Sequence, residues 1–466
     1  MKEILMLVKF AERRLELNSA DEIYCSNLIA EETGESAPLS VSTPVECESY
    51  SSDSPEELLK RIFKKAVENG KCGEGEYEEF SCRIMDILTP RPSEVRAGFY
   101  KRYKQNKRNA FEYYHALSVS SCYIKKEAVS RNIKWISDNT EKPLEITINL
   151  SKPEKNNIET AARLKAPASY PKCAICAENE GYTGNGTFRR NLRIVPVKLN
   201  GEDWFIQYSP YLYYPEHCIV FNRKHTPMKI SEDTILKLLD FTDFAPFYFI
   251  GCNACLPIVG GSILAHDHFQ GGLHEMPLFK CGGKLRVFPP DFEGEAYIAD
   301  WYNSVIVLKG ADKKNTAAAA NGIIRQWNVY SDESLGIIAE TDARHNAVTP
   351  IARKEGGGYT VYLILRNNRT DSSFPEGIFH AHREYHNIKS EAIGLIEAMG
   401  LFILPPRLKR QLNTVKNFLT GEERLLSSLS GEDSIQKDFI VKLLSEYGAS
   451  NTPKEAENII KNEVSA

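Results

Sequence analysis

The chain has 466 residues, which is too long for one simple core and favours several domains or an internal duplication. Its 58 basic and 62 acidic residues give a net charge of -4, which excludes the positive field typical of nucleic-acid-binding proteins. Eleven cysteines, and a start that lacks the long uncharged core of a secretory signal, favour reduced thiols, so we expect a cytoplasmic protein.

The first third of the chain is predicted to be helical. Ser54-Pro55-Glu56-Glu57 combines an N-cap, a proline at the first helical position and a capping-box glutamate, and Gly70 closes that helix. Another amphipathic helix is expected from residue 93 to about residue 117, and its basic cluster at 101–108 is typical of a solvated helix face. We therefore assign residues 1–140 to a helical N-terminal region.

Strand patterns begin near residue 144, where apolar residues alternate with polar ones up to residue 150. Residues 192–199 and 204–208 flank Asn200-Gly201, the strongest short-range signal for a hairpin, and residues 218–221 predict a further strand. Residues 257–264 are apolar and β-branched around a double glycine, which predicts a buried strand. The uncharged stretch 244–265 contains prolines and glycines that break a membrane-spanning helix, so we expect no membrane partner.

The end of that predicted strand carries the most informative residues of the chain. In an extended strand, alternate side chains share a face, so His266, His268 and Gln270 are expected on one side. Two histidines at this spacing are in most proteins ordinary core or surface residues. Here Gly271-Gly272 follow at once and allow close backbone approach to a ligand, which favours a functional site.

The remainder predicts a second sheet region followed by helices. Residues 359–365 form a strand after a triple-glycine turn, residues 390–399 form a helix, and the chain beyond residue 407 is helical and charged. His380-Ala381-His382 repeats the earlier spacing, which suggests duplication. The predicted fold class is α+β, with duplicated mixed-sheet units at 141–278 and 279–410 and a helical C-terminal tail at 411–466.

Cys173 and Cys176 are spaced so that both thiolates can reach one tetrahedral ion, which makes them half of a zinc site. Histidines would complete it, and the candidates are His225, His217 and His266. A second pair, Cys252 and Cys255, offers an alternative site with four cysteine ligands, and either pair could also be two ordinary buried thiols. We favour the mixed cysteine and histidine site.

His268 is the candidate nucleophile. Neutral imidazole has a free lone pair near neutral pH, so it can attack phosphorus without a separate base and carry the transferred group. Gln270 can donate its amide N–H to a phosphoryl oxygen, and Ser262 with the backbone N–H groups around Gly260-Gly261 can donate to phosphates. The sequence lacks the P-loop pattern, so a P-loop nucleotidase is unsupported.

The residues that carry this chemistry also resemble a known family. Residues 258–272, with 170–182, 345–353, 393–397 and 86–95, are similar to the second, bacterial class of galactose-1-phosphate uridylyltransferase, in the histidine-triad superfamily. The resemblance implies that UDP-glucose gives its uridylyl group to His268 and releases glucose 1-phosphate. Galactose 1-phosphate then takes the group to form UDP-galactose, a step of the Leloir pathway.

The resemblance also assigns further site residues. It implies a structural zinc held by Cys173, Cys176, His225 and His266, and no organic cofactor. Asn253, Gly261, Ser262 and Glu397 match substrate-binding positions, although this chain has Cys255 where the class has an aspartate. His380 and His382 resemble two ligands of a second metal, but the counterparts of its other ligands are missing, so that metal stays unassigned.

Two other functions compete with this one. A nucleotidyl hydrolase or dinucleoside polyphosphate phosphorylase of the same superfamily differs mainly in the acceptor that its pocket admits. A zinc-stabilised protein that binds sugar nucleotides without turnover belongs to a different class. The sequence leaves the oligomeric state open, including a homodimer.

Overall fold

The computed structural model describes residues 2–35, 55–137, 139–151, 170–183, 189–261 and 263–465. Ser54 and Ser262, both singled out above, lie outside the described residues. The chain divides into two compact units, Met1–Lys126 with Pro167–Thr226, and Glu127–Ala166 with Pro227–Ala466. The division into four parts at residues 140, 278 and 410 stays a prediction.

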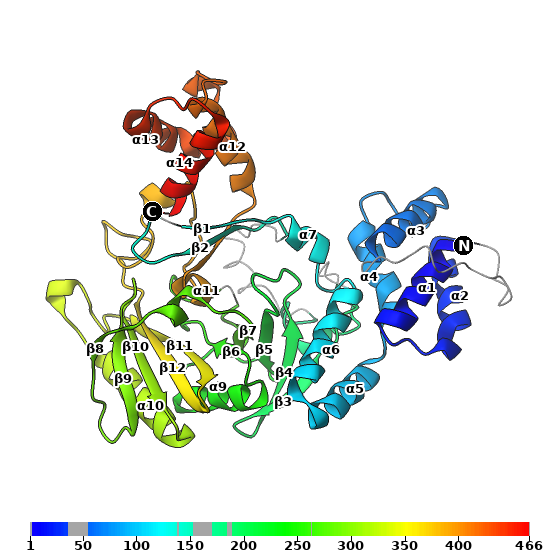
Figure 1. Cartoon of the computed structure of the whole chain (residues 1–466), viewed down its shortest axis with the longest axis horizontal. Coiled ribbons are helices and arrows are strands. Elements are labelled where there is room, and N and C mark those ends of the chain that lie inside the picture. The colour runs from blue at the N-terminus through cyan, green and yellow to red at the C-terminus, as the bar shows by residue number, and fades with distance from the viewer. Residues whose placement is uncertain are drawn as a thin grey trace. The chain divides into compact units, whose positions relative to one another are not determined.

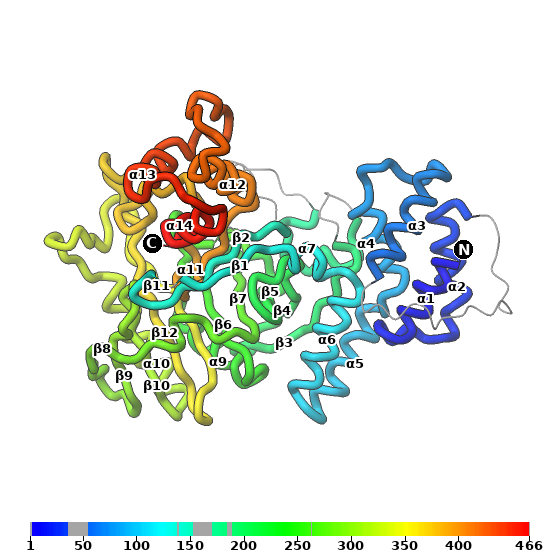
Figure 2. Tube along the Cα trace, turned by 45° about the horizontal axis from the view of Figure 1, so that its top comes forward, coloured from blue at the N-terminus to red at the C-terminus, as the bar shows by residue number. Residues whose placement is uncertain are grey.

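The helical first third is confirmed. The helices of the first unit are α1 (Lys2–Arg14), α2 (Glu22–Thr33), α3 (Glu56–Glu68), α4 (Tyr77–Leu88), α5 (Pro92–Gln105) and α6 (Lys107–Ser120). Helices α1 to α4 lie together in both views (Figures 1 and 2) and bury apolar side chains such as Phe10, Leu59 and Phe80 between them. Helix α3 ends as predicted, since Gly70 adopts a φ of +70° that favours glycine.

The second predicted helix, from residue 93 to about 117, is two helices. Asn106 breaks it with an extended backbone, φ -154° and ψ 120°, and its side chain caps α6 by accepting a hydrogen bond from the Asn109 N–H at 3.2 Å. The amphipathic pattern continues across the break, because α5 and α6 each bury apolar residues, so periodicity alone did not reveal the cap.

The strands of the first unit are β3 (Val195–Leu199), β4 (Glu202–Tyr208) and β5 (Cys218–Asn222), paired antiparallel in that order. The predicted hairpin is confirmed, with Asn200 and Gly201 at φ values of +46° and +80°, as a two-residue turn of this kind requires. Helix α6 is fixed to β4 and to the segment before β3 by Tyr114, whose hydroxyl lies within hydrogen-bond distance of the Arg193 and Ile206 carbonyl oxygens, at 2.6 and 3.0 Å.

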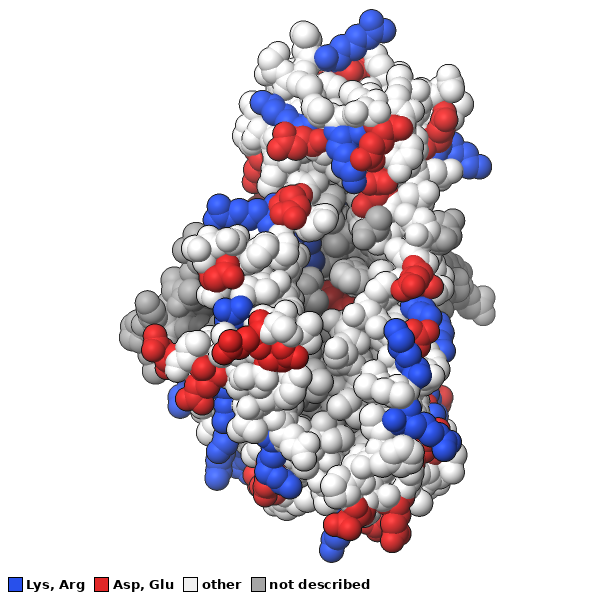
Figure 3. Space-filling view, turned by 90° about the vertical axis from the view of Figure 1, so that its left-hand side faces the viewer, with Lys and Arg blue, Asp and Glu red and all other residues white. Residues whose placement is uncertain are grey.

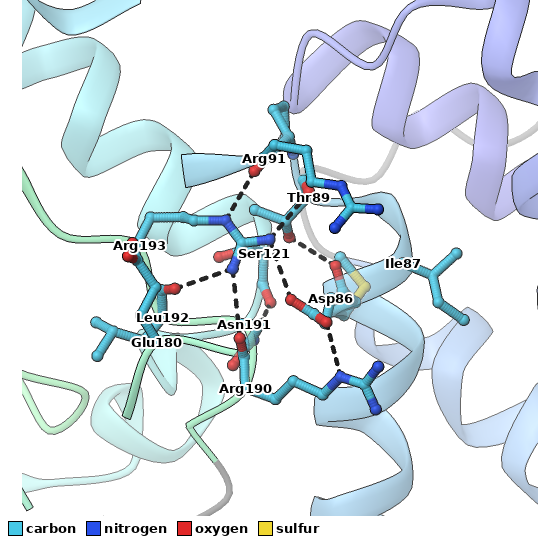
Figure 4. Close-up of polar contacts among 12 residues, drawn as sticks. Asp86, Ile87, Thr89, Arg91, Ser121, Glu180, Arg190, Asn191, Leu192 and Arg193 are labelled. Atoms are coloured by element: carbon cyan, nitrogen blue, oxygen red, sulfur yellow. Dashed lines mark hydrogen bonds and ion pairs between the residues drawn. The ribbon is translucent and has the colours of Figure 1, made fainter. Parts of the chain in front are cut away.

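An ion-pair network joins α4 to the segment before β3 (Figure 4). Arg193, with a side chain only 4 % exposed, donates to Asp86 Oδ1 at 3.0 Å, and Arg190 donates to Asp86 Oδ2 at 2.7 Å. The Arg193 guanidinium also donates to the backbone carbonyls of Pro90 and Thr89 just after the helix. Each buried charge is therefore paired, as burial requires.

The second unit contains the larger sheet. Its strands lie side by side in the order β7 (His268–Gly272), β6 (Phe249–Gly251), β11 (Asn346–Glu355), β12 (Gly358–Asn367), β10 (Val305–Gly310), β9 (Gly294–Ala299) and β8 (Gly283–Arg286). Helices α9 (Glu232–Phe244) and α10 (Lys313–Val329) pack on one face of it (Figure 1). A separate small sheet has the order β1 (Ile133–Ile136), β2 (Glu145–Ile148) and β13 (Leu401–Leu404).

The predicted duplication is visible in the element order. Three strands, a helix and two strands follow one another as β3, β4, β5, α9, β6, β7, and the series recurs as β8, β9, β10, α10, β11, β12. The α+β class with helical ends is therefore confirmed. The two His-x-His sequences are not equivalent in this repeat, because His268 begins β7 whereas His380 and His382 follow β12.

The C-terminal part of the chain is helical beyond residue 407, as predicted. Helices α12 (Arg407–Leu419), α13 (Lys437–Tyr447) and α14 (Pro453–Ser465) share an apolar cluster and lie together in Figure 2. The predicted helix 390–399 is reduced to α11 (Leu395–Ala398). Before α11, the side chains of Arg366 and His380 bind the backbone of Ile393 in a non-helical conformation. Helix α7 (Lys126–Ser130) lies inside the region predicted to be helical, whereas strand β1 was not expected there.

The surface and the hydropathy agree with the composition. On the face drawn in Figure 3, basic and acidic side chains are intermixed and leave a broad uncharged area between them, as a net charge of -4 suggests. In the described part of the chain, no helix combines the length and the apolar character that crossing a bilayer requires.

Candidate active site and metal site

His268 begins β7 and is held in one defined tautomer. Its Nδ1 lies 2.7 Å from the backbone carbonyl oxygen of His266. Because a carbonyl can only accept, Nδ1 carries the proton and Nε2 keeps its lone pair. The side chain is 5 % exposed, so the surrounding protein fixes this orientation. In this tautomer, Nε2 is the nitrogen that could act as a nucleophile.

The register of the sheet shows which residues share a face with His268. Directly opposed residues of antiparallel strands lie on the same face, and Gln270 is opposed to Gly251. On the next strands, Gly251 is opposed to Ile351, and Ile351 is opposed to Tyr362. His268 therefore shares its face with Gln270, as predicted. His266 precedes the strand, so its predicted place on the same strand face is wrong, although it is buried.

The described residues of the predicted buried strand, 257–261 and 263–264, form a loop instead. Ile258 has a φ of +72°, and a single bridge joins Ala254 to Gly260, so the chain folds back on itself. A Cβ on Gly260 would lie 2.4 Å from the Ala254 carbonyl oxygen, which explains the glycine at this place. The predicted burial holds only in part, since Val259 is 1 % exposed whereas Pro257 is exposed and Ile258 and Leu264 are half-buried.

Asn253 and Gly261, two predicted substrate-binding residues, touch each other. A Cβ on Gly261 would lie 2.6 Å from Asn253 Nδ2, so only glycine lets the loop approach this side chain. Asn253 Oδ1 accepts the Leu395 N–H at 2.8 Å, and the side chain is buried. Gly271 is needed for a different reason than predicted, because its Cβ would lie 2.4 Å from the Phe249 carbonyl oxygen on the neighbouring strand β6.

Glu397, the remaining predicted substrate-binding residue, is engaged within the protein. Its Oε2 accepts the Gly394 N–H at 3.2 Å, and its Oε1 accepts from Lys389 Nζ at 3.1 Å. Lys389 is 8 % exposed in its side chain and also donates to Glu391 and to the Ile403 carbonyl. These carboxylates raise the pKa of Lys389 against the effect of its burial, so it is a charged, fully paired ammonium group.

Three of the four predicted metal ligands gather in the first unit. The Sγ atoms of Cys173 and Cys176 are 3.4 Å apart, and Cys176 Sγ is 3.1 Å from His225 Nδ1. The ligand atoms of all three residues lie within 4.8 Å of one another and could hold a metal ion. Asn179 Nδ2 donates to the carbonyls of both cysteines, at 2.9 Å each, and fixes the turn. The hydrogen bond with Cys173 and burial raise the pKa of Cys176, so without a cation this thiol keeps its proton.

The remaining metal candidates are His266, His217 and the second cysteine pair. His266 belongs to the second unit and is 1 % exposed. His217, the alternative histidine, is buried against the rings of Tyr213 and Tyr214. Cys252 and Cys255 are absent from the metal-ligand groups found among the described residues.

His380 and His382 are bonded to backbone. The Ile393 N–H donates to His380 Nε2 at 3.2 Å, and His382 Nε2 donates to the Ile378 carbonyl at 3.2 Å. Neither residue joins a metal-ligand group within the part of the chain that is described. Burial lowers the pKa of His380, which keeps this ring neutral and able to accept from Ile393.

Two of the buried cations of this unit, Arg366 and Lys389, bear on the 393–397 segment and were not singled out in the sequence. Arg366, 7 % exposed, lies on β12, four residues after Tyr362, and therefore on the face that carries His268. The other is Lys389. The available signal for Arg366 was a lone charge at the end of the apolar strand 360–365.

Comparison with known proteins identifies the class and the family. Residues 16–227 match the family described as galactose-1-phosphate uridyl transferase, N-terminal domain, and residues 242–422 match its C-terminal domain. A galactose-1-phosphate uridylyltransferase of Caldanaerobacter subterraneus subsp. tengcongensis is 43 % identical over 98 % of this chain and 91 % of its own length. One of Halalkalibacterium halodurans is 45 % identical over 82 % of this chain and 77 % of its own.

Solved structures that resemble the chain are more distant. Yeast Ap4A phosphorylase Apa2 in complex with AMP is 12 % identical, covers 66 % of this chain and 87 % of its own, and has a TM-score of 0.34. The curated relatives, in contrast, match at high identity over most of the sequence.

The chain is therefore a nucleotidyltransferase. It belongs to the galactose-1-phosphate uridylyltransferase family.

Proposed function

We propose that this protein transfers UMP from UDP-glucose to galactose 1-phosphate through a covalent uridylyl-His268 intermediate, as a cytoplasmic step of the Leloir pathway. The observation that carries the proposal is the hydrogen bond from His268 Nδ1 to the His266 carbonyl. It leaves Nε2 with the lone pair that a nucleophile needs, and the ring requires no further base.

The two displacements balance on this ring. Nε2 attacks the α-phosphorus of UDP-glucose, an N–P bond forms, and the P–O bond to the β-phosphate breaks and releases glucose 1-phosphate. The uridylylated imidazole then carries a positive charge, which the Nδ1–H bond to the His266 carbonyl stabilises. A phosphate oxygen of galactose 1-phosphate attacks the same phosphorus, and His268 regains its lone pair.

The neighbouring predicted residues have roles that fit this chemistry. Gln270, on the same strand face, would donate to the phosphoryl oxygen whose charge grows in the transition state. Asn253 and Gly261 would line the nucleotide site together with Ser262, and Glu397 would meet the hexose. The buried Asn253 side chain and its contact with Gly261 support a preformed site.

We also propose that Cys173, Cys176, His225 and His266 hold one structural zinc ion. The donor set is the one that Zn²⁺ prefers, and a tetrahedral ion would place neighbouring thiolates ~3.8 Å apart, close to the observed 3.4 Å. Zinc supplies no group to the reaction here. Its ligand His266 would gain a fixed backbone, and that backbone carbonyl orients His268.

The test of the function is an isotope exchange. UDP-glucose and labelled glucose 1-phosphate are expected to exchange label without galactose 1-phosphate, because the first displacement is reversible and complete in itself. Added galactose 1-phosphate should then yield UDP-galactose. UMP release at the same rate with or without a sugar phosphate would instead identify a hydrolase, and no turnover would identify a binding protein.

The zinc site has its own prediction. The purified protein is expected to contain one zinc per chain, which Cys173→Ser removes and which the double variant Cys252→Ser, Cys255→Ser retains. Metal analysis of the three proteins decides between the two sites. Zinc that disappears only with the second pair would contradict the assignment. Since structural zinc stabilises the folded state, the Cys173→Ser protein should also melt at a lower temperature.

A further inference from the structure

Residues 393–397 form a segment that crosses the sheet face of His268 and is held there by side chains. Arg366 Nη2 donates to the Ile393 carbonyl at 2.8 Å, and the Ile393 N–H donates to His380 at 3.2 Å. The Leu395 N–H donates to Asn253 at 2.8 Å. Both the N–H and the C=O of Ile393 therefore have a side-chain partner. Of the three side chains that bind this segment, only that of Arg366 belongs to β12.

The underside of this segment is closely fitted to the sheet. A Cβ on Gly251 would lie 2.8 Å from the Leu395 side chain and 3.0 Å from that of Ile351. The same segment carries Glu397, whose carboxylate is bonded to the Gly394 N–H and to Lys389. A shift of Ile393 would therefore move the backbone that positions Glu397.

Burying Arg366 to bind the Ile393 carbonyl costs folding free energy. The residue is 7 % exposed, and its Nη1 has no hydrogen-bond partner among the described residues. Burial lowers its pKa to about 10, and Glu397 acts on it only through its charge. A buried guanidinium with an unsatisfied nitrogen costs folding free energy that an apolar side chain of similar shape would not.

Arg366 is also too far along the sheet to touch the phosphorus that His268 attacks. Strands β7, β6, β11 and β12 are neighbours in that order, and three interstrand spacings amount to ~14 Å. Its influence on the reaction must therefore pass through the segment that it binds.

We propose that Arg366 is a positioning residue for the acceptor sugar phosphate: it fixes the Ile393 carbonyl and so sets the segment whose Glu397 faces the hexose. This inference rests on the proposed function, since it uses the assignment of Glu397 to the hexose. It explains why a poorly satisfied charge stands at the end of an otherwise apolar strand.

The test compares Arg366→Met with wild type in three measurements. We expect the KM for galactose 1-phosphate to rise about tenfold, the order of one lost hydrogen bond to a charged group. The amount of uridylyl-enzyme formed per chain at saturating UDP-glucose should stay the same. The melting temperature should be unchanged or higher, because methionine removes the buried charge. A residue with a purely structural role would instead lower the melting temperature and leave KM unchanged.

Two further variants serve as controls. Arg366→Lys keeps a donor for Ile393 and should recover part of the KM. Arg369→Met is the matched control, because Arg369 donates to the Gly336 carbonyl at 3.0 Å, a loop contact outside the segment, and it should keep the wild-type KM. A wild-type KM in Arg366→Met, or an equal rise in Arg369→Met, would overturn the proposal.

Amide hydrogen exchange gives a readout that needs no substrate. In Arg366→Met the amides of Ile393 and Leu395 should exchange faster, while those of the central strands β11 and β12 stay protected. Unchanged exchange in the segment would refute the positioning role even if the enzyme proved inactive on galactose 1-phosphate. Failure of transfer in the wild type would instead refute the proposed function.

Discussion

Replacing His268 with asparagine is expected to lower uridylyl transfer by at least about 10⁴-fold, because the variant has no ring nitrogen to attack phosphorus. Asparagine still offers an amide N–H near the His266 carbonyl, so the strand start should keep its hydrogen bond and its fold. The rate loss therefore belongs to the chemical step. Steady-state rates at saturating UDP-glucose and galactose 1-phosphate measure it.

The same variant tests the covalent intermediate directly. Wild-type protein mixed with UDP-glucose labelled in the uridine should retain label after an alkaline quench, in which an N–P bond survives, and should lose it in acid. His268→Asn should retain none. His345→Asn is the matched control, since His345 lies just before β11, bonds Thr341 and Asn368, and should keep full labelling. Normal labelling of His268→Asn would remove the proposed mechanism.

The elements that could be predicted from the sequence have local causes. The hairpin at Asn200-Gly201 follows from two residues that tolerate positive φ, and the end of α3 follows from Gly70. The strand after Gly356-Gly357-Gly358 likewise combines a turn signal with a continuous apolar run, and β12 occupies it. In each case the deciding residues lie within a few positions of the element.

Elements decided by distant contacts were predicted less well. The apolar run 257–264 has the composition of a buried strand, but its described residues form no strand, and Gly261 within it approaches Asn253 closely. The expected helix at 390–399 fails in its first half because side chains from β12 and from the loop after β6 bind its backbone. These partners are 27 and 142 residues away, beyond the reach of periodicity.

The candidate site shows the same division. The spacing of His266, His268 and Gln270, and of Cys173 and Cys176, is local, so the sequence could single out these residues. The bond that selects the His268 tautomer, and the burial of Arg366 opposite the 393–397 segment, depend on backbone geometry and on long-range packing. Sequence patterns indicate the reactive groups better than they indicate the groups that orient them.

The largest effect on stability is expected from Asp86. Asparagine at this position would leave Arg193, whose side chain is 4 % exposed, without its carboxylate, and would remove the partner of Arg190 as well. Breaking a buried ion pair by removing one partner typically costs about 3 to 5 kcal/mol. The backbone carbonyls that still bind Arg193 should limit the loss here to about 3 kcal/mol. Urea unfolding followed by circular dichroism measures the loss.

The matched control is an aspartate whose ion pair is exposed to solvent. Asp203 forms an ion pair with Lys198 at 2.6 Å, but both side chains are exposed, at 49 and 69 %, so Asp203→Asn should leave the unfolding midpoint unchanged. A double variant, Asp86→Asn with Arg193→Met, should lose less stability than the two single variants added together, because each single change strands the other charge. Strict additivity would show that the network in Figure 4 does not couple α4 to the segment before β3, and that the carbonyl contacts of Arg193 alone hold the junction.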